Sequence, residues 1–355
     1  MQRNFFEKHP KIIILIVNLF FLGILYFILS LNIFQDVKDG EKYSVIDRVV
    51  YQVRCEGKRH IRMRENLPNQ VSYKIPPYAP GEKYIFRTDE NGFVEPSKIH
   101  EKSDLNIFFF GGSTTECETV SELYRFPYLT GRILEEKTGK KINAYNAGKS
   151  GNNSLHSINN LINKAAPLHP DIIVRMDNVN DLSTLLYEAT YWNRNKGRSN
   201  LVCFSKNRAA MRNLANEWDE SPFVNLVTDP THQARVRQEH YKILKLFVAV
   251  VRGVGAKPVL MTQANRIEID PDFSTGRGDT EFNRAYRKLY LEFHDITRRV
   301  AKEENIMLID LAKLVPPKED LIYDSVHLSN EGSKIVAGIV AKNLEKMVKE
   351  FKSKH

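Results

Sequence analysis

The 355-residue sequence contains little cysteine and no internal repeat or low-complexity tract. Its three cysteines, Cys55, Cys117 and Cys203, are too few and too widely spaced for a disulfide framework or a zinc site. A single bridge between Cys55 and Cys203 stays open for an oxidising compartment, whereas Cys117 is expected to pack as a small hydrophobic side chain. Small disulfide- or zinc-stapled domains are therefore excluded, and the length predicts one large hydrophobic core.

Signatures of nucleic-acid binding are also missing, although the formal net charge is +9. There is no arginine-rich arm, no zinc-finger spacing and no aromatic-basic RNA-binding motif. A positive charge of this size suits an anionic partner. The missing motifs favour anionic lipid or acidic glycan over nucleic acid.

One long segment carries no charge at all, residues 12–34 (IIILIVNLFFLGILYFILSLNIF). It exceeds the ~20 residues that a helix needs to cross a bilayer. The residues at its end are not the small ones of a signal-peptide cleavage site, so an uncleaved transmembrane anchor is predicted. The short basic tail of residues 1–11 is typical of a signal anchor with a cytoplasmic N-terminus and an extracytoplasmic globular part. The Lys and Arg residues on the two sides of the span do not by themselves decide this orientation.

Polar sequence with basic clusters and a proline-rich patch follows over residues 35–102. It has no sustained helix or strand period, apart from a short strand and an Asn-Gly turn expected within residues 84–93. We interpret this segment as a membrane-proximal stem that partly packs on the main domain, residues 103–355.

In the main domain, apolar runs alternate with amphipathic segments, which predicts an α/β fold: a three-layer α/β/α sandwich with a central parallel sheet. Strands are expected at residues 105–110, 142–145, 172–176, 258–262 and 306–309. Helices are expected at residues 122–138, 154–166, 232–254, 279–304 and 330–351. Residues 182–229 do not fit the alternation, and we interpret them as an insertion that forms a lid or a substrate-binding segment.

Polar clusters follow the first three of these strands and precede the last helix. They are residues 111–113 (GGS), 146–151 (NAGKSG), 177–181 (DNVND) and 324–327 (DSVH). Because parallel strands all end at one edge of a sheet, the clusters are expected to converge there. Taken singly, Ser113 or Thr114 is a helix N-cap, Gly151 a turn residue and Asn180 an Asx-turn. Their joint occurrence is what predicts a catalytic site.

The residue types in these clusters support nucleophilic catalysis. Ser113 needs a base within about 3 Å, and His327 is the natural one. Asp324, three residues earlier, can accept from the other ring nitrogen. The backbone N–H groups of Ser113 and Gly151 and the side-chain amide of Asn180 are donors suited to an oxyanion. No metal or dissociable cofactor is required by this chemistry.

One competing motif is residues 148–150 (GKS), which look like the end of a phosphate-binding loop. The motif requires a glycine five positions before Gly148, where this sequence has Asn143. This departure disfavours a nucleotide site.

In its four polar clusters, over roughly residues 105–351, the sequence resembles the SGNH (GDSL-like) hydrolases. That family has a serine after the first strand, a glycine after the second, an asparagine in a G-x-N-D element and a late D-x-x-H. The resemblance implies a flavodoxin-like sandwich, catalytic residues Ser113, Asp324 and His327, and an oxyanion hole of Ser113, Gly151 and Asn180.

Two positions depart from the family's pattern. Gly112 stands in place of the aspartate of Gly-Asp-Ser, although Gly-Gly-Ser-Thr-Thr is itself familiar among bacterial relatives. Asn178 stands in place of the glycine of G-x-N-D, which affects the expected substrate more than the expected activity.

The remaining titratable residues of the domain have ordinary interpretations. Arg175 and Asp177 flank the exit of the third strand; lining of the pocket is one interpretation, and an ordinary surface pair is the default one. The other histidines are expected on the surface or packed in the core; they are His156, His169, His232, His240 and His294.

The prediction is a membrane-anchored serine esterase that acts on an acylated small molecule, glycan or lipid of the cell envelope. An O-acyltransferase of the same fold stays open, because the sequence does not separate water from a sugar hydroxyl as the acyl acceptor. A catalytically silent module that binds glycan or scaffolds an assembly is a further alternative. The complete set of Ser113, Asp324 and His327 argues against it, since a pure binder needs no nucleophile, base and orienting acid together.

Overall fold

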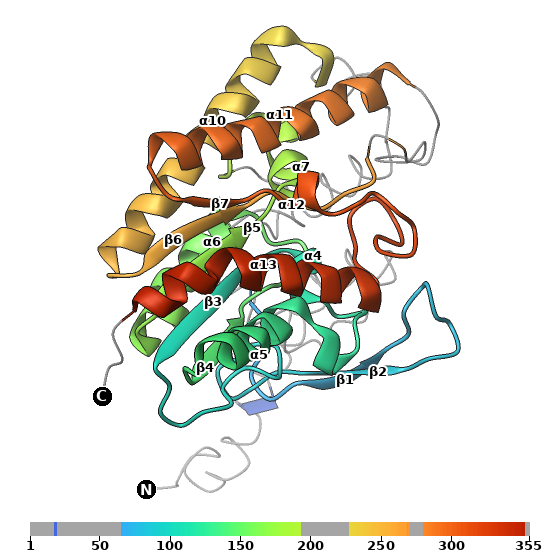
Figure 1. Cartoon of the computed structure of the whole chain (residues 1–355). Coiled ribbons are helices and arrows are strands. Elements are labelled where there is room, and N and C mark those ends of the chain that lie inside the picture. The colour runs from blue at the N-terminus through green and yellow to red at the C-terminus, as the bar shows by residue number, and fades with distance from the viewer. Residues whose placement is uncertain (1–17, 20–64, 193–226, 268, 270–279, 352–355) are drawn as a thin grey trace, which may run out of the picture. The chain divides into compact units, whose positions relative to one another are not determined.

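A parallel sheet forms the centre of the fold (Figure 1). The computed structural model describes residues 18–19, 65–192, 227–267, 269 and 280–351, and all of these except the first pair belong to one compact unit. The sheet order is β4-β3-β5-β6-β7, and every neighbouring pair is parallel. The strand bounds are β3 Leu105–Gly111, β4 Ile142–Asn146, β5 Ile172–Met176, β6 Lys257–Met261 and β7 Met307–Ile309.

Helices cover both faces of this sheet, so the predicted α/β/α sandwich is confirmed. One face carries α5 (Phe126–Thr138) and α13 (Asn330–Glu350), which pack against each other. The other face carries α6 (Ser154–Asn160), α7 (Val179–Glu188), α10 (Pro230–Gly253) and α11 (Glu281–Glu303). The shorter elements are α4 (Ser113–Glu116), α12 (Leu311–Leu314) and the helical turns η2 (Glu122–Tyr124), η3 (Leu161–Ala165) and η4 (Ala166–Leu168).

The alternation of side chains along β3 divides the core into two halves. Phe108 and Phe110 pack with the α10 and α11 side, whereas Ile107 and Phe109 pack with α5 and α13. A central parallel strand is buried on both faces, and so it has no solvent-facing position that would favour a polar side chain. This burial is the physical reason for the uninterrupted apolar run before Gly111.

Side-chain caps fix where the long helices begin. Asp229 accepts from the backbone N–H groups of residues 231 and 232 at the start of α10. Thr280 and Ser329 cap α11 and α13 in the same way. Each cap satisfies backbone donors that have no partner within the helix.

The observed strands and helices lie within two residues of the expected bounds, with three differences. The expected helix 154–166 is divided, because α6 ends at Asn160 and the chain continues through η3 and η4. The expected helix 122–138 is divided into η2 and α5, because Arg125 has a non-helical backbone (φ −58, ψ 123) and Pro127 starts a new first turn. Helix α7 takes in the first residues of the expected insertion. Residues 193–226 of that insertion lie outside the described residues.

The described part of the expected stem, residues 65–102, packs on the domain. It contains an antiparallel hairpin of β1 (Val71–Lys74) and β2 (Tyr84–Arg87), which confirms the strand expected within residues 84–93. Phe93 is fully buried, with its ring 5.5 Å from that of Phe108 and 5.2 Å from that of Tyr145. The segment therefore contributes to the core.

Several predictions fall on residues outside this description. The expected anchor, residues 12–34, is described only at Asn18 and Leu19, and Cys55 and Cys203 are not described. Among the helices that the structure describes, none is long and apolar enough to cross a bilayer. Cys117 is buried with a free thiol, and burial raises its pKa to about 12, so it packs as expected.

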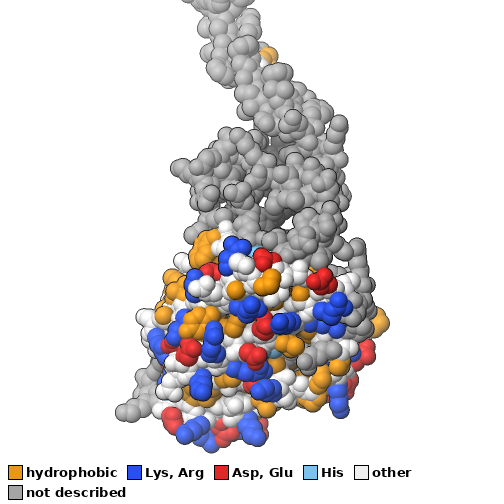
Figure 2. Space-filling model, turned by 90° about the horizontal axis from the view of Figure 1, so that it is seen from above, with side chains coloured by type: hydrophobic (Ala, Val, Ile, Leu, Met, Phe, Trp, Pro, Cys, Tyr) orange, Lys and Arg blue, Asp and Glu red, His pale blue; other side chains and the backbone are white. Residues whose placement is uncertain are grey.

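Surface charge is mixed over the face in Figure 2, where Lys and Arg side chains lie among acidic and apolar ones. Helices α10 and α11 form ion pairs with each other, with Arg237 2.8 Å from Glu292. Arg252, at the end of α10, lies 2.5 Å from Glu304, which follows α11. Part of the positive charge is thus neutralised locally where these two helices meet.

Candidate active site

The order of the strands reverses between β3 and β5. From β3 the chain first adds β4 on one side and then continues with β5, β6 and β7 on the other. Open α/β sheets bind ligands at such a point, outside the carboxyl ends of the strands. Ser113 begins α4 just after β3, and Asn180 lies in the first turn of α7 just after β5.

His327 lies between Ser113 and Asp324. Its Nε2 atom is 2.7 Å from Ser113 Oγ, and its Nδ1 atom is 2.6 Å from Asp324 Oδ2. The other carboxylate oxygen of Asp324 accepts the backbone N–H groups of Val326 at 2.8 Å and His327 at 2.7 Å. The structure therefore brings Ser113 next to His327, 214 residues later in the sequence, and next to the His327–Asp324 pair as a whole.

Electrostatics favour an ionised Asp324 beside the ring. Burial raises the pKa of Asp324, but the hydrogen bond and charge of His327 and the two backbone N–H groups outweigh burial, and the pKa lies below its usual range. An ionised carboxylate holds the proton of His327 on Nδ1, which leaves Nε2 as an acceptor toward Ser113.

An aromatic wall borders the histidine. The Tyr323 ring stacks on the His327 ring, with centroids 5.9 Å apart and planes at 17°. Tyr78 comes from the proline-rich patch of the expected stem, and its ring centroid lies 5.1 Å from that of Tyr323. The Tyr78 hydroxyl donates to the Thr119 carbonyl at 2.8 Å. Sequence reasoning missed this wall, because nothing in the local pattern around Tyr78 links it to a loop that follows more than 200 residues later.

The Asn180 amide lies directly against Gly112. A Cβ atom at position 112 would be 2.2 Å from Asn180 Nδ2 and 3.4 Å from the Asn152 carbonyl oxygen. The first distance is too short for a Cβ atom and the Asn180 amide to keep these positions together, so glycine leaves room for the amide. The contact gives a physical reason for one of the two departures from the family's pattern.

Gly151 lies in the loop between β4 and α6, here called the Gly151 loop (residues 147–153). Its φ of +78° is in the left-handed region that favours glycine. The loop contacts the Ser113 side of the site, because the Lys149 N–H donates to the Gly111 carbonyl at 3.1 Å. The three expected oxyanion donors thus lie on segments that touch one another around Gly112.

Glu116 is a residue that sequence reasoning missed. It is fully buried, and its carboxylate accepts the Ser150 N–H at 2.6 Å and lies 3.4 Å from Lys149 Nζ. Burial raises its pKa, which the Lys149 charge and the Ser150 N–H partly oppose. Two residues of the GKS sequence, Lys149 and Ser150, therefore contact a carboxylate of the protein itself.

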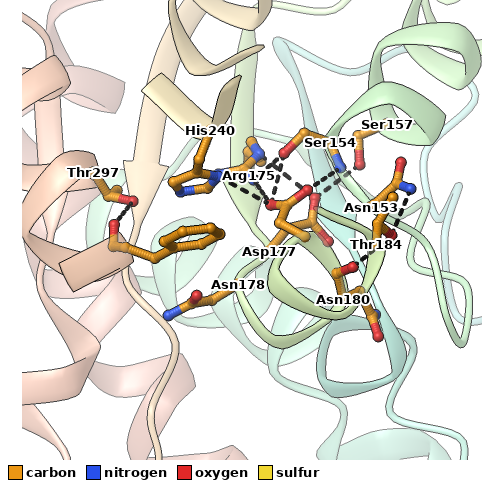
Figure 3. Close-up of polar contacts among 12 residues, drawn as sticks. Asn153, Ser154, Ser157, Arg175, Asp177, Asn178, Asn180, Thr184, His240 and Thr297 are labelled. Atoms are coloured by element: carbon orange, nitrogen blue, oxygen red, sulfur yellow. Dashed lines mark hydrogen bonds and ion pairs between the residues drawn. The ribbon is translucent and has the colours of Figure 1, made fainter. Parts of the chain in front are cut away.

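The expectation that Arg175 and Asp177 form a surface pair is wrong. Arg175 is 0% and Asp177 3% exposed. Side chains of β5 belong to the core on both faces of the sheet, and Figure 3 shows Arg175 and Asp177 among other polar side chains. Arg175 Nη2 donates to Asp181 Oδ2 at 2.5 Å, and Arg175 Nε lies 3.5 Å from Asp177 Oδ2. The available signal was an arginine inside an otherwise apolar strand (IIVRM), which marks a buried charge that needs a partner.

This buried cluster holds one positive charge and two carboxyl groups. Burial raises the pKa of Asp177 to about 7, although Arg175 opposes the shift. His240 lies 3.8 Å from Asp181, and burial lowers its pKa to about 3, so its ring is neutral. The raised pKa of Asp177 and the neutral ring of His240 both keep the net charge of this buried cluster small.

The other histidines fit their ordinary interpretation. His156, His232 and His294 are buried, and His169 is exposed. In the part of the chain that the structure describes, no group of three or more His, Cys, Asp or Glu residues is placed to hold a metal ion.

A model of the GDSL-like lipase/acylhydrolase family matches residues 109–335 of the sequence. The chain belongs to this family. The expected SGNH (GDSL-like) relationship is thereby confirmed, and the protein is a carboxylic ester hydrolase by family. No curated protein matches it in sequence.

Solved structures with a similar fold include Axe2, an acetylxylan esterase from Geobacillus stearothermophilus, and LAE5, an α/β hydrolase from the metagenome of Lake Arreo, Spain. Axe2 is 16% identical with a TM-score of 0.44, over 68% of this chain and 95% of that one. LAE5 is 16% identical with a TM-score of 0.43, over 68% of this chain and 97% of that one.

Replacing Gly112 with alanine tests the contact with Asn180. The added Cβ would push the Asn180 amide away, because that amide is the flexible neighbour. We expect Gly112→Ala to fold and to lower kcat for an ester by about 10²-fold, the typical loss when one oxyanion donor is removed. Steady-state kinetics measure kcat, and thermal unfolding shows whether the variant is folded. Unchanged kcat with a folded variant would show that Asn180 does not act from this position.

Replacing Asp177 with asparagine tests the buried cluster. A carboxyl group whose pKa rises from 3.8 to about 7 holds its proton more tightly in the folded protein than in the unfolded chain. Folding stability is therefore lost as the pH rises from the lower pKa to the higher one, by about 1.4 kcal/mol for each pH unit between them. Asparagine has no such proton to lose, so the Tm of Asp177→Asn relative to wild type should rise between pH 4 and pH 8.

The neighbouring charges have a limited effect on this comparison. Arg175 and Asp181 are present in both proteins, and the neutral His240 lowers the stability of both as the pH falls below its usual pKa. The difference in Tm isolates position 177. A difference that stays constant from pH 4 to pH 8 would contradict the raised pKa.

Proposed function

We propose that the protein is a serine esterase that removes an acyl group from a hydroxyl oxygen, with Ser113 as the nucleophile. The observation that carries this proposal is the continuous contact from Ser113 Oγ to His327 Nε2 at 2.7 Å and from His327 Nδ1 to Asp324 at 2.6 Å. A hydroxyl, an imidazole and a carboxylate in this arrangement can pass a proton away from the attacking oxygen.

The reaction proceeds in two halves. His327 takes the Ser113 proton while Oγ bonds to the ester carbonyl carbon, and the resulting oxyanion accepts from Ser113, Gly151 and Asn180. His327 then gives the proton to the leaving oxygen, the carbon–oxygen bond breaks and the alcohol departs. Water, deprotonated by His327, attacks the acyl-enzyme, and the acid leaves as the proton returns to Ser113.

The proposed setting is a membrane, with the substrate an acylated glycan or lipid of the envelope. Its support is the uncharged segment 12–34 and the formal net charge of +9, which attracts anionic surfaces. The globular part then lies outside the cytoplasm. Water as acceptor gives an esterase; a sugar hydroxyl in its place would give an acyltransferase.

The Ser113→Ala variant tests the reaction. Full-length protein in detergent should hydrolyse p-nitrophenyl acetate, and Ser113→Ala should lose at least about 10³-fold in kcat because no nucleophile remains. A fluorophosphonate should label wild-type protein at Ser113 and leave the variant unlabelled. Tyr73→Phe is the control variant, because Tyr73 is an exposed residue of the β1 strand, and it should turn over the ester as wild type does. Equal turnover by wild type and Ser113→Ala would instead favour a binding module.

The anchor is tested by fractionation. Full-length protein should sediment with membranes and resist extraction by high salt and carbonate, because a spanning helix is held by burial in hydrocarbon. A variant lacking residues 12–34 should be released. Protease added to intact spheroplasts should degrade the globular part if it lies outside the cytoplasm. Protection of that part, or release of the full-length chain by carbonate, would contradict the proposed location.

A further inference from the structure

The Gly151 loop is held on one side by the helix that begins with Ser113. Glu116 lies in the last position of α4 and turns its carboxylate to the loop, where the Ser150 N–H donates to it at 2.6 Å. Lys149 approaches the second oxygen of the same carboxylate at 3.4 Å. Residues 149 and 150 directly precede Gly151, so this contact restrains the part of the loop that carries the Gly151 N–H.

On its other side, the loop is held by the helix that carries Asn180. Asp181 accepts both the backbone N–H and the hydroxyl of Ser154, each at 2.8 Å. Ser154 is the first residue of α6, directly after the loop. Arg175 donates to Asp181 and also to the Ser154 hydroxyl. The positive charge of Arg175 therefore compensates the buried Asp181 carboxylate at its hydrogen bond with Ser154.

A second set of hydrogen bonds also links the end of the Gly151 loop to α7 (Figure 3). The Asn153 side-chain amide donates to the Thr184 hydroxyl at 3.1 Å, and that hydroxyl donates to the Asn180 carbonyl at 2.7 Å. The Asn153 carbonyl side-chain oxygen meanwhile caps α6. Through the Thr184 hydroxyl, the last residue of the Gly151 loop is thus hydrogen-bonded to the backbone carbonyl of Asn180.

We propose that Glu116, Asp181 and Thr184 are positioning residues that clamp the Gly151 loop between Ser113 and Asn180, so that the three oxyanion donors converge on one point. None of the three touches the reacting atoms. They act through Ser150, Ser154 and Asn153, which lie on either side of Gly151. This inference rests on the proposed function, because it assigns a role in the same oxyanion hole.

The physical reason for such a clamp is the geometry that an oxyanion requires. Donors must lie about 2.7–3.1 Å from the developing charge, and a misplacement of about 1 Å can cost 10²-fold in rate. The Gly151 loop has a left-handed glycine and no regular structure to hold it. Its position therefore depends on contacts with the segments around it, which are the hydrogen bond from the Lys149 N–H to the Gly111 carbonyl and the side-chain contacts described above. Among such contacts, charged acceptors make stronger hydrogen bonds than neutral ones.

Paired substitutions test the clamp. Glu116→Met and Thr184→Val keep the side-chain volume but remove the acceptor or hydroxyl, whereas Glu116→Gln and Thr184→Ser keep a hydrogen-bonding oxygen. Glutamine keeps a side-chain oxygen that can accept the Ser150 N–H. Thr297→Val is the matched control: Thr297 is also buried and donates to a carbonyl four residues earlier, but within α11.

The readouts are kcat and KM for p-nitrophenyl acetate, the inhibition constant of phenylboronic acid and the Tm. We expect Glu116→Met and Thr184→Val to lose about tenfold or more in kcat, with KM within about twofold. The inhibition constant should rise by a similar factor, because a boronic acid forms a tetrahedral adduct that uses the same donors. Glu116→Gln and Thr184→Ser should keep most of the activity.

The outcomes separate this inference from the proposed function. If wild type turns over the ester through Ser113, but Glu116→Met and Thr184→Val lose no more kcat than Thr297→Val, the clamp is overturned and the esterase stands. If wild type has no turnover that depends on Ser113, the proposed function itself fails. If one of the two variants does not fold, the other carries the test. Glu116→Met removes the contact with Ser150 before Gly151, and Thr184→Val removes the contact with Asn153 after it.

Discussion

The adjacency of β3 and β5 is the constraint on which the site depends. Phe110 and Gly111 at the end of β3 pair in register with Arg175 and Met176 at the end of β5. The turns that follow must therefore leave the sheet side by side, and they carry Ser113 and Asn180. The close approach of Gly112 to the Asn180 amide is possible only because these strand ends are level. His327 then reaches the same edge from the loop that precedes α13.

Placing polar groups at a buried edge has an electrostatic cost, and the chain offsets it with paired charges. Arg175 is surrounded by Asp177, Asp181 and the Ser154 hydroxyl, and Glu116 faces Lys149. A buried ion pair contributes little net stability, since desolvation opposes the attraction. Its gain here is positional, because Glu116 and Asp181 accept from Ser150 and Ser154, which lie within and directly after the Gly151 loop.

Much of the architecture was predictable from the sequence, because apolar runs and helical periods depend on local burial. The strand at residues 172–176 was placed without error, and the ends of α10, α11 and α13 lie within two residues of expectation. Ser113, Asp324 and His327 could be chosen because their clusters follow or precede regular elements. The structure brings these three side chains together, while their catalytic roles stay predictions.

Contacts between distant segments were not predictable. Nothing local to Tyr78 indicates that it borders Tyr323, and the burial of Glu116 depends on how the Gly151 loop folds over α4. The burial of Arg175 had a signal in its apolar strand, but a sequence does not say which partners compensate it. Such contacts depend on tertiary packing, which side-chain periodicity does not encode.

A crystal structure of the protein inhibited by a fluorophosphonate tests the central claim most directly. The account predicts phosphorus bonded to Ser113 Oγ, with its free oxygen about 2.7–3.1 Å from the N–H groups of Ser113 and Gly151 and from Asn180 Nδ2. Phosphorus bonded to another residue would contradict the account. So would a free oxygen that turns away from these three donors.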